Sequence, residues 1–560
     1  MRTRFVIILS FVFSATAAAQ ELNAPPVTTF KPDTSLPKVN LPEFVITGRS
    51  QMELPVTDKP TILIDSSFFG NRELQGYEYA VPLDRSFNSG DAPAANGISS
   101  LFAHASYGHY TTADYLFSGV GSYDGYLINA AFDGNYTSGF IPLTVARRFS
   151  AGGGVSKDLV RSDAMDWNSS LDLAYARSSY FLYGESSPGQ LRETSRFRMG
   201  LNSDLEISGT PVMVGFGFDR FSLSDIMDNV EAVERLQAGT RLPLLKGGVN
   251  LNVDFDNINH TVDHYSGPVP LTADSLPAVI LGNPPEFEKL TYFLKLGAGY
   301  DGAAGPLSYI LDVNYFQYSD DNTSSVAKIY PDLKFVYRFG DSLSFFAGIS
   351  GDVRQASLLD FVAADRYVNS YIPLVSSQRF PVFNVGANIS IIRDLTLTPQ
   401  FTYEGVNGQP IYATVQTNSL FYLDRTKIYT FSIDGRYVKN DFDGTAGLQF
   451  ETGSADSISR IPNVPLFTGD ISGTYHFMPS LSLEGNFTLL SSRYADLALR
   501  QKLNSVDLLG LRLSYSTHIS VVPFEFYIEG KNLLNQKYYV WQNYQEFPLS
   551  LFVGINCRLI

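Results

Sequence analysis

The sequence predicts an all-β fold, a transmembrane antiparallel β-barrel of about 22 strands that follows a short irregular periplasmic segment. Three observations predict it. Apolar and polar residues alternate along many segments, short and long connections alternate between these segments, and the chain begins with a stretch typical of exported proteins.

Alternation is clearest in two segments, 249–256 and 509–516. In the first, Val249, Leu251 and Val253 share one face, while Asn250, Asn252 and Asp254 share the other. In the second, Leu511 and Arg512 fall on opposite faces. Period two is the signature of a β-strand. A charged residue in mid-strand suits a wet lumen, so we expect Asn250, Asn252, Asp254 and Arg512 to line the lumen and Val249, Leu251, Val253 and Leu511 to face lipid.

The connections between the predicted strands fall into two classes. If the first strand runs outward from the periplasm, the connections at its starting rim are mostly tight turns, such as Ser208–Thr210 and Arg393–Asp394. Those at the opposite rim include long loops, such as Thr261–Glu286 and Arg354–Ser377. Short periplasmic turns and long extracellular loops are typical of outer-membrane barrels.

The N-terminal part of the chain divides into three predicted segments. Residues 1–19 are typical of a signal peptide, with Arg2 and Arg4 before a short apolar run and small residues at its end. Residues 20–55 form a Pro-rich periplasmic tether, residues 56–98 are irregular and could insert into the lumen, and residues 99–560 form the barrel. The predicted location is the outer membrane of a Gram-negative bacterium.

Composition limits the function classes. A single cysteine, Cys557, excludes a disulfide-stapled secreted scaffold. With 41 basic and 56 acidic residues the chain is acidic, so nucleic acid is not an expected partner. The sequence shows no nucleophile elbow, phosphate-binding loop or dinucleotide-binding turn. We therefore predict no enzyme activity, no catalytic or cofactor-binding residues, and no cofactor.

The segment 522–539 resembles the end of TonB-dependent outer-membrane receptors. In that family the penultimate strand runs into an Asn-Leu-rich loop, matched here by Asn532, Leu533, Leu534, Asn535, Tyr538 and Tyr539. Pro548 and the alternating stretch from Leu549 to the end match the family's last strand. The resemblance implies a barrel of about 22 strands, in agreement with the count from alternation, and function in the uptake or passage of a solute.

A second resemblance lies in the tether. Members of this family carry a short extended box that adds to a strand of the periplasmic TonB protein. The matching residues are Glu43, Phe44, Val45, Ile46, Thr47 and Gly48. Pro-rich flanks keep such a segment open, and β-branched residues suit strand addition. The resemblance implies contact with a TonB-type energy transducer.

One departure from the family is large. Its members hold a globular plug inside the barrel, but only 50 residues separate Gly48 from Ser99. The barrel is therefore open, closed by a separate plug or lipoprotein partner, or filled by its own tether and folded-in loops. The alternative function is a plugless scaffold or assembly barrel that holds a surface or periplasmic partner. Outer-membrane lipids are partners under either function.

Two patterns resemble metal sites. His260 and His264 could share a strand face and hold a transition metal, and Asp320-Asp321-Asn322 could bind Ca²⁺. Polar loop residues are the simpler interpretation of both patterns, so we predict no metal site.

Aromatic residues near strand ends are predicted to form interface girdles. These are Tyr107, Tyr110, Tyr115, Tyr330, Phe380, Tyr403, Tyr527 and Tyr538.

Overall fold

The computed structural model describes residues 97–559, apart from 163–164, 185–189, 245–246, 265–286, 341, 415–417, 440 and 457. The predicted signal peptide, the tether with its TonB-box-like segment and nearly all of the irregular segment lie outside the described residues. Within the described part, no helix has the length and apolar character needed to cross a membrane.

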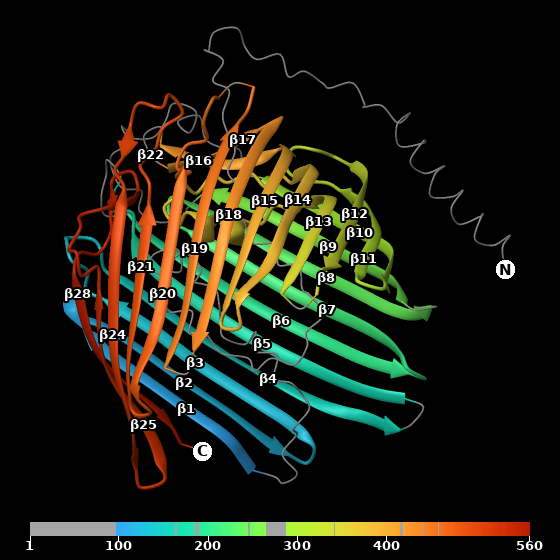
Figure 1. Ribbon diagram of the computed structural model, residues 1–560. Helices are drawn as coiled ribbons and strands as arrows, with labels where there is room; N and C mark the ends of the chain where they lie inside the picture. Colours follow the sequence, from blue (N-terminus) through green and yellow to red (C-terminus); the bar gives the residue numbers. More distant parts are fainter. Residues whose placement is uncertain are drawn as a thin grey trace, which may run out of the picture. The chain divides into compact units, whose positions relative to one another are not determined.

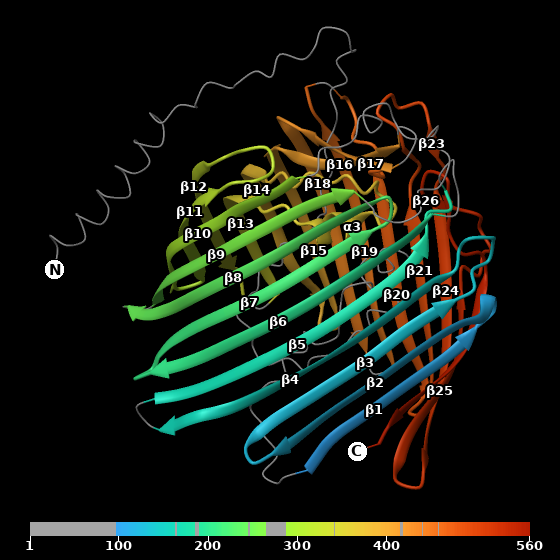
Figure 2. The same ribbon diagram turned by 180° about the vertical axis from the view of Figure 1, so that it is seen from behind.

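The predicted all-β fold is confirmed, because a single sheet of 22 antiparallel strands closes on itself. The first strand, β1, pairs with the last, β28, from Phe102↔Arg558 to Gly108↔Phe552. Figures 1 and 2 show the tilted strands from opposite sides. In chain order the barrel strands are β1 (Gly97–Gly108), β2 (Thr112–Tyr123), β3 (Tyr126–Thr137), β4 (Ala146–Ser162), β5 (Met165–Phe181), β6 (Leu191–Ile207), β7 (Thr210–Ser224), β8 (Met227–Leu244), β9 (Gly247–His264), β10 (Phe287–Ala304), β11 (Leu307–Tyr318), β12 (Val326–Arg338), β13 (Leu343–Arg354), β14 (Ser377–Ile392), β15 (Leu395–Asn407), β18 (Thr426–Lys439), β19 (Phe442–Ser454), β20 (Phe467–Met478), β21 (Leu481–Leu490), β24 (Val506–Ile519), β25 (Val522–Lys531) and β28 (Ser550–Arg558).

The two faces of the barrel wall follow the alternation in the sequence. Across β15, β18 and β19, Phe401 pairs with Phe431 and Phe431 with Phe450, and each of these rings is at least 40% exposed on the outer face. The residue before Phe401 on β15 points to the opposite face, and the side chains in its row are polar. Gln400 pairs there with Ser432, which pairs with Gln449 of β19. The phenylalanine row faces lipid, and the hydroxyl and amide row faces the lumen.

The faces predicted for individual residues agree with this pattern. Leu251 and Leu511 are 42% and 37% exposed on the lipid face. Arg512 is only 8% exposed and forms an ion pair with Glu525, 3.0 Å apart, on the lumen face.

The two rims differ as predicted. One rim carries turns of a few residues, of which Ser208–Gly209 is typical. Both residues have positive φ, 51° and 79°, which is the geometry of a type I′ hairpin turn and explains the glycine. The opposite rim carries the long loops, and we call it the outer rim because extracellular loops are the long ones in such barrels.

The loops at the outer rim contain secondary structure of their own. They hold the helix α3 (Leu358–Ala364) and the short strands β16 (Gln409–Thr414), β17 (Asn418–Leu423), β22 (Arg493–Tyr494), β23 (Lys502–Leu503), β26 (Tyr539–Trp541) and β27 (Tyr544–Gln545), with the 3₁₀ turn η4 (His109–Thr111) at the same rim. Strands β16 and β17 pair as a hairpin. The largest apolar cluster of the described residues lies here and includes Tyr180 of β5 and Phe221 and Leu223 of β7.

The predicted aromatic girdle is only partly correct. Tyr115 is 42% exposed on the lipid face. Tyr330 and Tyr527 instead face the lumen, because Tyr330 pairs with Asn314 and Tyr527 with Ser514, both on lumen-facing positions. The Arg512 guanidinium lies over the Tyr527 ring, with its Cζ atom 3.8 Å from the ring centroid. Tyr538 is buried among the outer loops.

Candidate functional site: a lid at the outer mouth

The connection between β13 and β14, residues 355–376, crosses the mouth of the barrel, and we call it the lid. It includes α3, which lies inside the ring of strands near the outer rim (Figure 2). The lid carries apolar side chains that pack against the wall and the neighbouring loops. Those with at most 5% exposure are Leu358, Phe361, Val362, Tyr367, Val368, Ile372 and Leu374. Their partners in the cluster include Phe221 and Leu223 of β7 and Trp541 and Tyr544 of the last loop.

A wall carboxylate fixes the start of α3. Ser357 occupies the N-cap position but forms no capping bond with its own side chain. The Leu358 backbone N–H instead donates to Glu231 Oε2 of β8 at 2.8 Å, and the Ser357 hydroxyl donates to the same oxygen at 3.1 Å. The first turn of the helix is thereby attached to the barrel wall, because unpaired N–H groups at a helix start need acceptors.

Three further wall residues hold main-chain oxygens of the lid. Tyr180 Oη of β5 and Arg192 Nη1 of β6 both donate to the Arg366 carbonyl, each at 2.8 Å. Asn229 Nδ2 of β8 donates to the Ser370 carbonyl at 3.1 Å. Arg192 also pairs with Asp225, 2.6 Å apart, and both side chains are fully buried. A buried pair of this kind fixes the geometry of the wall side of the lid.

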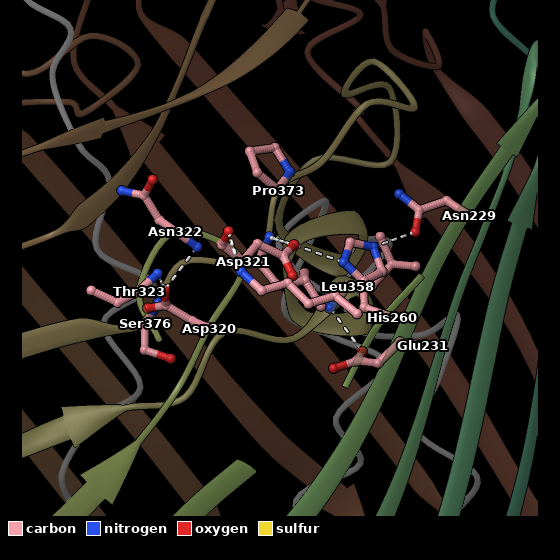
Figure 3. Close-up of polar contacts among 12 residues, drawn as sticks. Asn229, Glu231, His260, Asp320, Asp321, Asn322, Thr323, Leu358, Pro373 and Ser376 are labelled. Atoms are coloured by element: carbon pink, nitrogen blue, oxygen red, sulfur yellow. Dashed lines mark hydrogen bonds and ion pairs between the residues drawn. The ribbon is translucent and has the colours of Figure 1, made fainter. Parts of the chain in front are cut away.

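His260 and the acidic turn after β11 form a second attachment (Figure 3). The His260 ring is fully buried, with Nδ1 2.7 Å from Asp321 Oδ2 and Nε2 2.8 Å from Asn229 Oδ1. The same Asp321 oxygen accepts the Leu374 N–H of the lid at 2.6 Å. Next to it, Asp320 Oδ2 accepts the N–H of Ser376 at 2.9 Å. Wall, turn and lid therefore share one hydrogen-bonded network.

In this network, His260 and Asp320 take part in hydrogen bonds within the protein. Both ring nitrogens of His260 already have protein partners, so neither nitrogen is available to a metal ion. Asp320 Oδ1 accepts the N–H groups of Asn322 and Thr323, as in an Asx turn. Among the described residues, no group of three or more His, Cys, Asp or Glu side chains is placed to hold a metal ion.

The opposite edge of the lid is attached to the outer loops. Val368 forms a parallel β-bridge with Asn418 of β17, and the Asn369 N–H donates to the Asn418 carbonyl at 2.7 Å. Tyr412 Oη of β16 donates to the Phe361 carbonyl at 2.9 Å. The Tyr367 ring stacks on the Tyr544 ring, with centroids 3.7 Å apart. The lid thus spans from the wall at β5–β9 to the loops beyond β15 and β25.

Two buried acidic groups near the lid, Asp365 and Glu546, have raised pKa values. Burial raises the pKa of Asp365 to about 7, an effect that the Tyr367 N–H bond and the nearby Arg192 only partly offset. Asp365 has no exposed surface. Burial also raises the pKa of Glu546 in the last loop. At these two positions the protonated form is therefore favoured more than in an exposed carboxyl.

Below the lid, the lumen wall has two chemically different parts. From β6 to β10 it carries ion pairs, including Arg235–Asp256 at 2.9 Å and Arg241–Asp301 at 2.7 Å. From β14 to β20 hydroxyl and amide groups dominate. Examples are the Asn384–Thr402–Thr430 row and the Gln400–Ser432–Gln449–Thr468 row. A solute in the lumen meets ion pairs on one side and mainly hydroxyl and amide groups on the other, with Asp434, Arg436, Glu451 and Asp470 among them.

The structure places the TonB-box-like residues Glu43 to Gly48 outside the described part of the chain. The lid residues were missed in the sequence, although one signal was present. The connection after Arg354 contains Leu358, Leu359, Phe361 and Val362, which is unusually apolar for an extracellular loop. An apolar loop in such a barrel indicates that it folds inward against other residues.

Comparison with known proteins adds to this description. No family model matches the sequence, and no curated protein matches it. The barrel is similar to the FrpB iron transporter of Neisseria meningitidis, F5-1 variant, in its apoprotein form (TM-score 0.64, 10% identity, 84% of this chain and 82% of that chain). It is also similar to the siderophore receptor PirA of Acinetobacter baumannii (TM-score 0.63, 9% identity, 84% and 81%). The unliganded ferric citrate transporter FecA gives a TM-score of 0.60 at 13% identity, over 83% and 79% of the two chains. At these identities the likeness shows a shared fold.

Proposed function

We propose that this outer-membrane barrel, which has the fold of TonB-dependent receptors, admits a solute and that the lid gates its passage. The single observation that carries the proposal is the attachment of one loop to both sides of the mouth, by Glu231 and Asn229 on the wall and by Tyr412 and Asn418 on the loops. Such a lid has to move before a solute can enter from outside.

The permeability of the outer membrane tests the gate. In a Gram-negative host that makes a periplasmic β-lactamase, nitrocefin hydrolysis reports entry. The double variant Asn229→Ala/Glu231→Ala removes lid contacts and should increase the rate of hydrolysis several-fold. The matched control is Glu234→Ala/Asn257→Ala, because these residues also lie on β8 and β9 and share a 3.2 Å hydrogen bond, but on the outer face. Equal rates in the two variants would contradict gating and favour the scaffold function.

Coupling to a TonB-type transducer is part of the proposal. It rests on the resemblance of Glu43 to Gly48 to the family's box, in a Pro-rich tether that suits strand addition. A photo-crosslinker at Val45 should capture the transducer. Ile46→Pro should abolish uptake without changing barrel stability, because proline removes a main-chain donor. Full uptake by Ile46→Pro, with no crosslink, would reduce the tether to a linker.

We also propose that the segment Val56–Gly97 narrows the lumen. A barrel of about 22 strands is too wide to be filled by its own wall side chains, and this segment offers Phe68, Phe69, Tyr77, Tyr79 and Phe87 for packing. Removal of residues 56–96 should raise single-channel conductance in a planar bilayer. An unchanged conductance would place the segment outside the lumen and favour a separate plug or lipoprotein partner.

A further inference from the structure

A small cavity lies between the lid and the wall on the side of β13–β16. It is lined by Ser357, Asp360 and Phe361 of the lid, by Arg354, Ser377 and Arg379 at the ends of β13 and β14, and by Gln409 at the start of β16, among others. Leu358, Phe361 and Val362 of α3 are buried in the apolar cluster, whereas Asp360 is exposed. Arg196 of β6 and Arg235 of β8, both on the lumen face, lie near enough to act on the Asp360 carboxylate. The cavity is therefore on the lumen side of the lid.

Two polar groups of this cavity lack hydrogen-bond partners among the described residues. Gln409 is 2% exposed, yet its Nε2 has no acceptor. A buried unsatisfied amide group costs about 1–3 kcal/mol, so a partner is expected. The Asp360 carboxylate accepts no hydrogen bond from the described residues either. The cavity thus offers one orphaned buried donor, Gln409 Nε2, and one exposed acceptor, the Asp360 carboxylate.

The charges around the cavity are otherwise compensated. Arg379 lies 2.8 Å from Glu404 and 3.3 Å from Asp352, so its guanidinium has two acidic partners. Arg354 lies near Asp360, so this carboxylate also has a cationic neighbour. A fully charged ligand group would leave one of these charges unbalanced, which is unfavourable in a partly buried site. The residues favour a ligand group without net charge.

Size limits the group further. The cavity volume is about 20 Å³, which suits one water-sized group. A hydroxyl is such a group, and it accepts one hydrogen bond and donates another. It would accept from Gln409 Nε2 and donate to Asp360.

The wall below the cavity also offers hydrogen-bonding groups without charge. Arg379 is joined to Glu404 of β15, and the next lumen-facing residues of that strand are Thr402, Gln400 and Thr398. Neutral hydroxyl and amide groups exchange hydrogen bonds with a polyol without the cost of desolvating a charge. The wall at β6–β10 carries more ion pairs, beside amide groups such as those of Asn252 and Gln237.

We propose that the cavity is a binding subsite for an uncharged, hydroxyl-rich solute of the sugar class, held between the lid and the wall. The subsite binds one hydroxyl group of the solute. The rest of the solute extends from it along the rows of Thr, Ser and Gln side chains on β15, β18 and β19. The inference rests on the proposed function, since it names the class of solute that the barrel admits. Because the solute touches both the lid and β16, its binding is coupled to the position of the lid.

Saturation-transfer NMR on the full chain in nanodiscs tests the subsite. The probes are maltotriose and glucose, with glucuronate and glucosamine as charged analogues of the same ring. Maltotriose and glucose should receive saturation at millimolar concentration, and the charged analogues at least fivefold less. Gln409→Leu and Asp360→Asn should each weaken maltotriose binding about tenfold, which corresponds to 1.4 kcal/mol. The control Gln237→Leu, on the lumen face of β8 in the charged sector, should leave it unchanged.

Three results would overturn the inference. The charged analogues could bind as well as the neutral sugars, the two variants could leave maltotriose binding unchanged, or 20 mM maltotriose could give no signal, in which case the cavity holds a water only. Asp360→Asn changes an exposed side chain and keeps the test valid if Gln409→Leu fails to fold. Sugar binding without nitrocefin entry in the lid variant would contradict the proposed gate but not the subsite.

Discussion

The two edges of the lid are attached by different kinds of bond. At the wall edge, side chains of barrel strands hold the main chain of the lid, as Glu231 holds Leu358 and Asn229 holds Ser370. At the loop edge, the lid joins a β-bridge to Asn418 and stacks Tyr367 on Tyr544. The barrel strands are fixed by continuous ladders, whereas the loop edge belongs to connections outside the ladder. If the lid gates the barrel as proposed, we expect it to leave the wall and to move together with the loops.

The largest expected effect comes from the buried pair at the wall edge. Arg192→Leu leaves Asp225 buried without its partner and removes one donor to the Arg366 carbonyl. Loss of one member of a buried pair costs about 3–5 kcal/mol. Urea unfolding of the barrel in detergent should show a loss of this size. The double variant Arg192→Leu/Asp225→Leu should recover much of it, and a wild-type midpoint for the single variant would contradict the role of the pair.

The next effect is a pH dependence of the lid. The pKa of Asp365 is raised to about 7 in the folded protein from an ordinary value of 3.8, so the folded state binds more protons between these pH values. Its stabilising contribution is complete below pH 3.8 and is lost progressively as the pH rises from 3.8 through 7, by about 4 kcal/mol in all. Hydrogen exchange of the lid amides should be faster at pH 8 than at pH 5, after correction for intrinsic rates. Asp365→Asn should remove most of this difference, and an unchanged pH profile in the variant would assign it to other groups.

A smaller effect is expected at Asn229. Asn229→Ala removes the bond to the Ser370 carbonyl and leaves His260 Nε2 without its partner. An unsatisfied buried group costs about 1–3 kcal/mol. Thermal unfolding of the barrel should show this loss, and Asn257→Ala on the outer face of β9 serves as the control. A loss no greater than that of the control would show that the His260 network does not hold the lid.

The smallest effect is expected at the loop edge. Tyr412→Phe removes one hydrogen bond to the Phe361 carbonyl and keeps the ring in place. A single bond of this kind contributes about 1 kcal/mol. The loss of stability should be clearly smaller than that of Arg192→Leu. A loss as large as that of Arg192→Leu would show that Tyr412 contributes more than this one hydrogen bond.

The wall could be predicted from the sequence, but the lid could not. Leu251 and Arg512 were assigned to the correct faces because alternation is a local signal. Tyr527 shares its strand face with Glu525 and Glu529, so alternation indicates the lumen there, whereas the position near a strand end wrongly predicts a girdle. The lid depends on contacts between distant residues, such as Glu231 with Leu358, which lie 127 positions apart. Local patterns carry no information about such pairs.

Hydrogen–deuterium exchange of the full chain in nanodiscs tests most directly whether the lid leaves the wall and stays with the loops. In Asn229→Ala/Glu231→Ala, we expect at least tenfold faster exchange at the Leu358 amide, which donates to Glu231 in the unmodified protein. The Asn369 amide, which donates to Asn418, and the β16–β17 hairpin should keep their protection. Equal acceleration at Leu358, Asn369 and the hairpin, or no acceleration at Leu358, would contradict this motion of the lid.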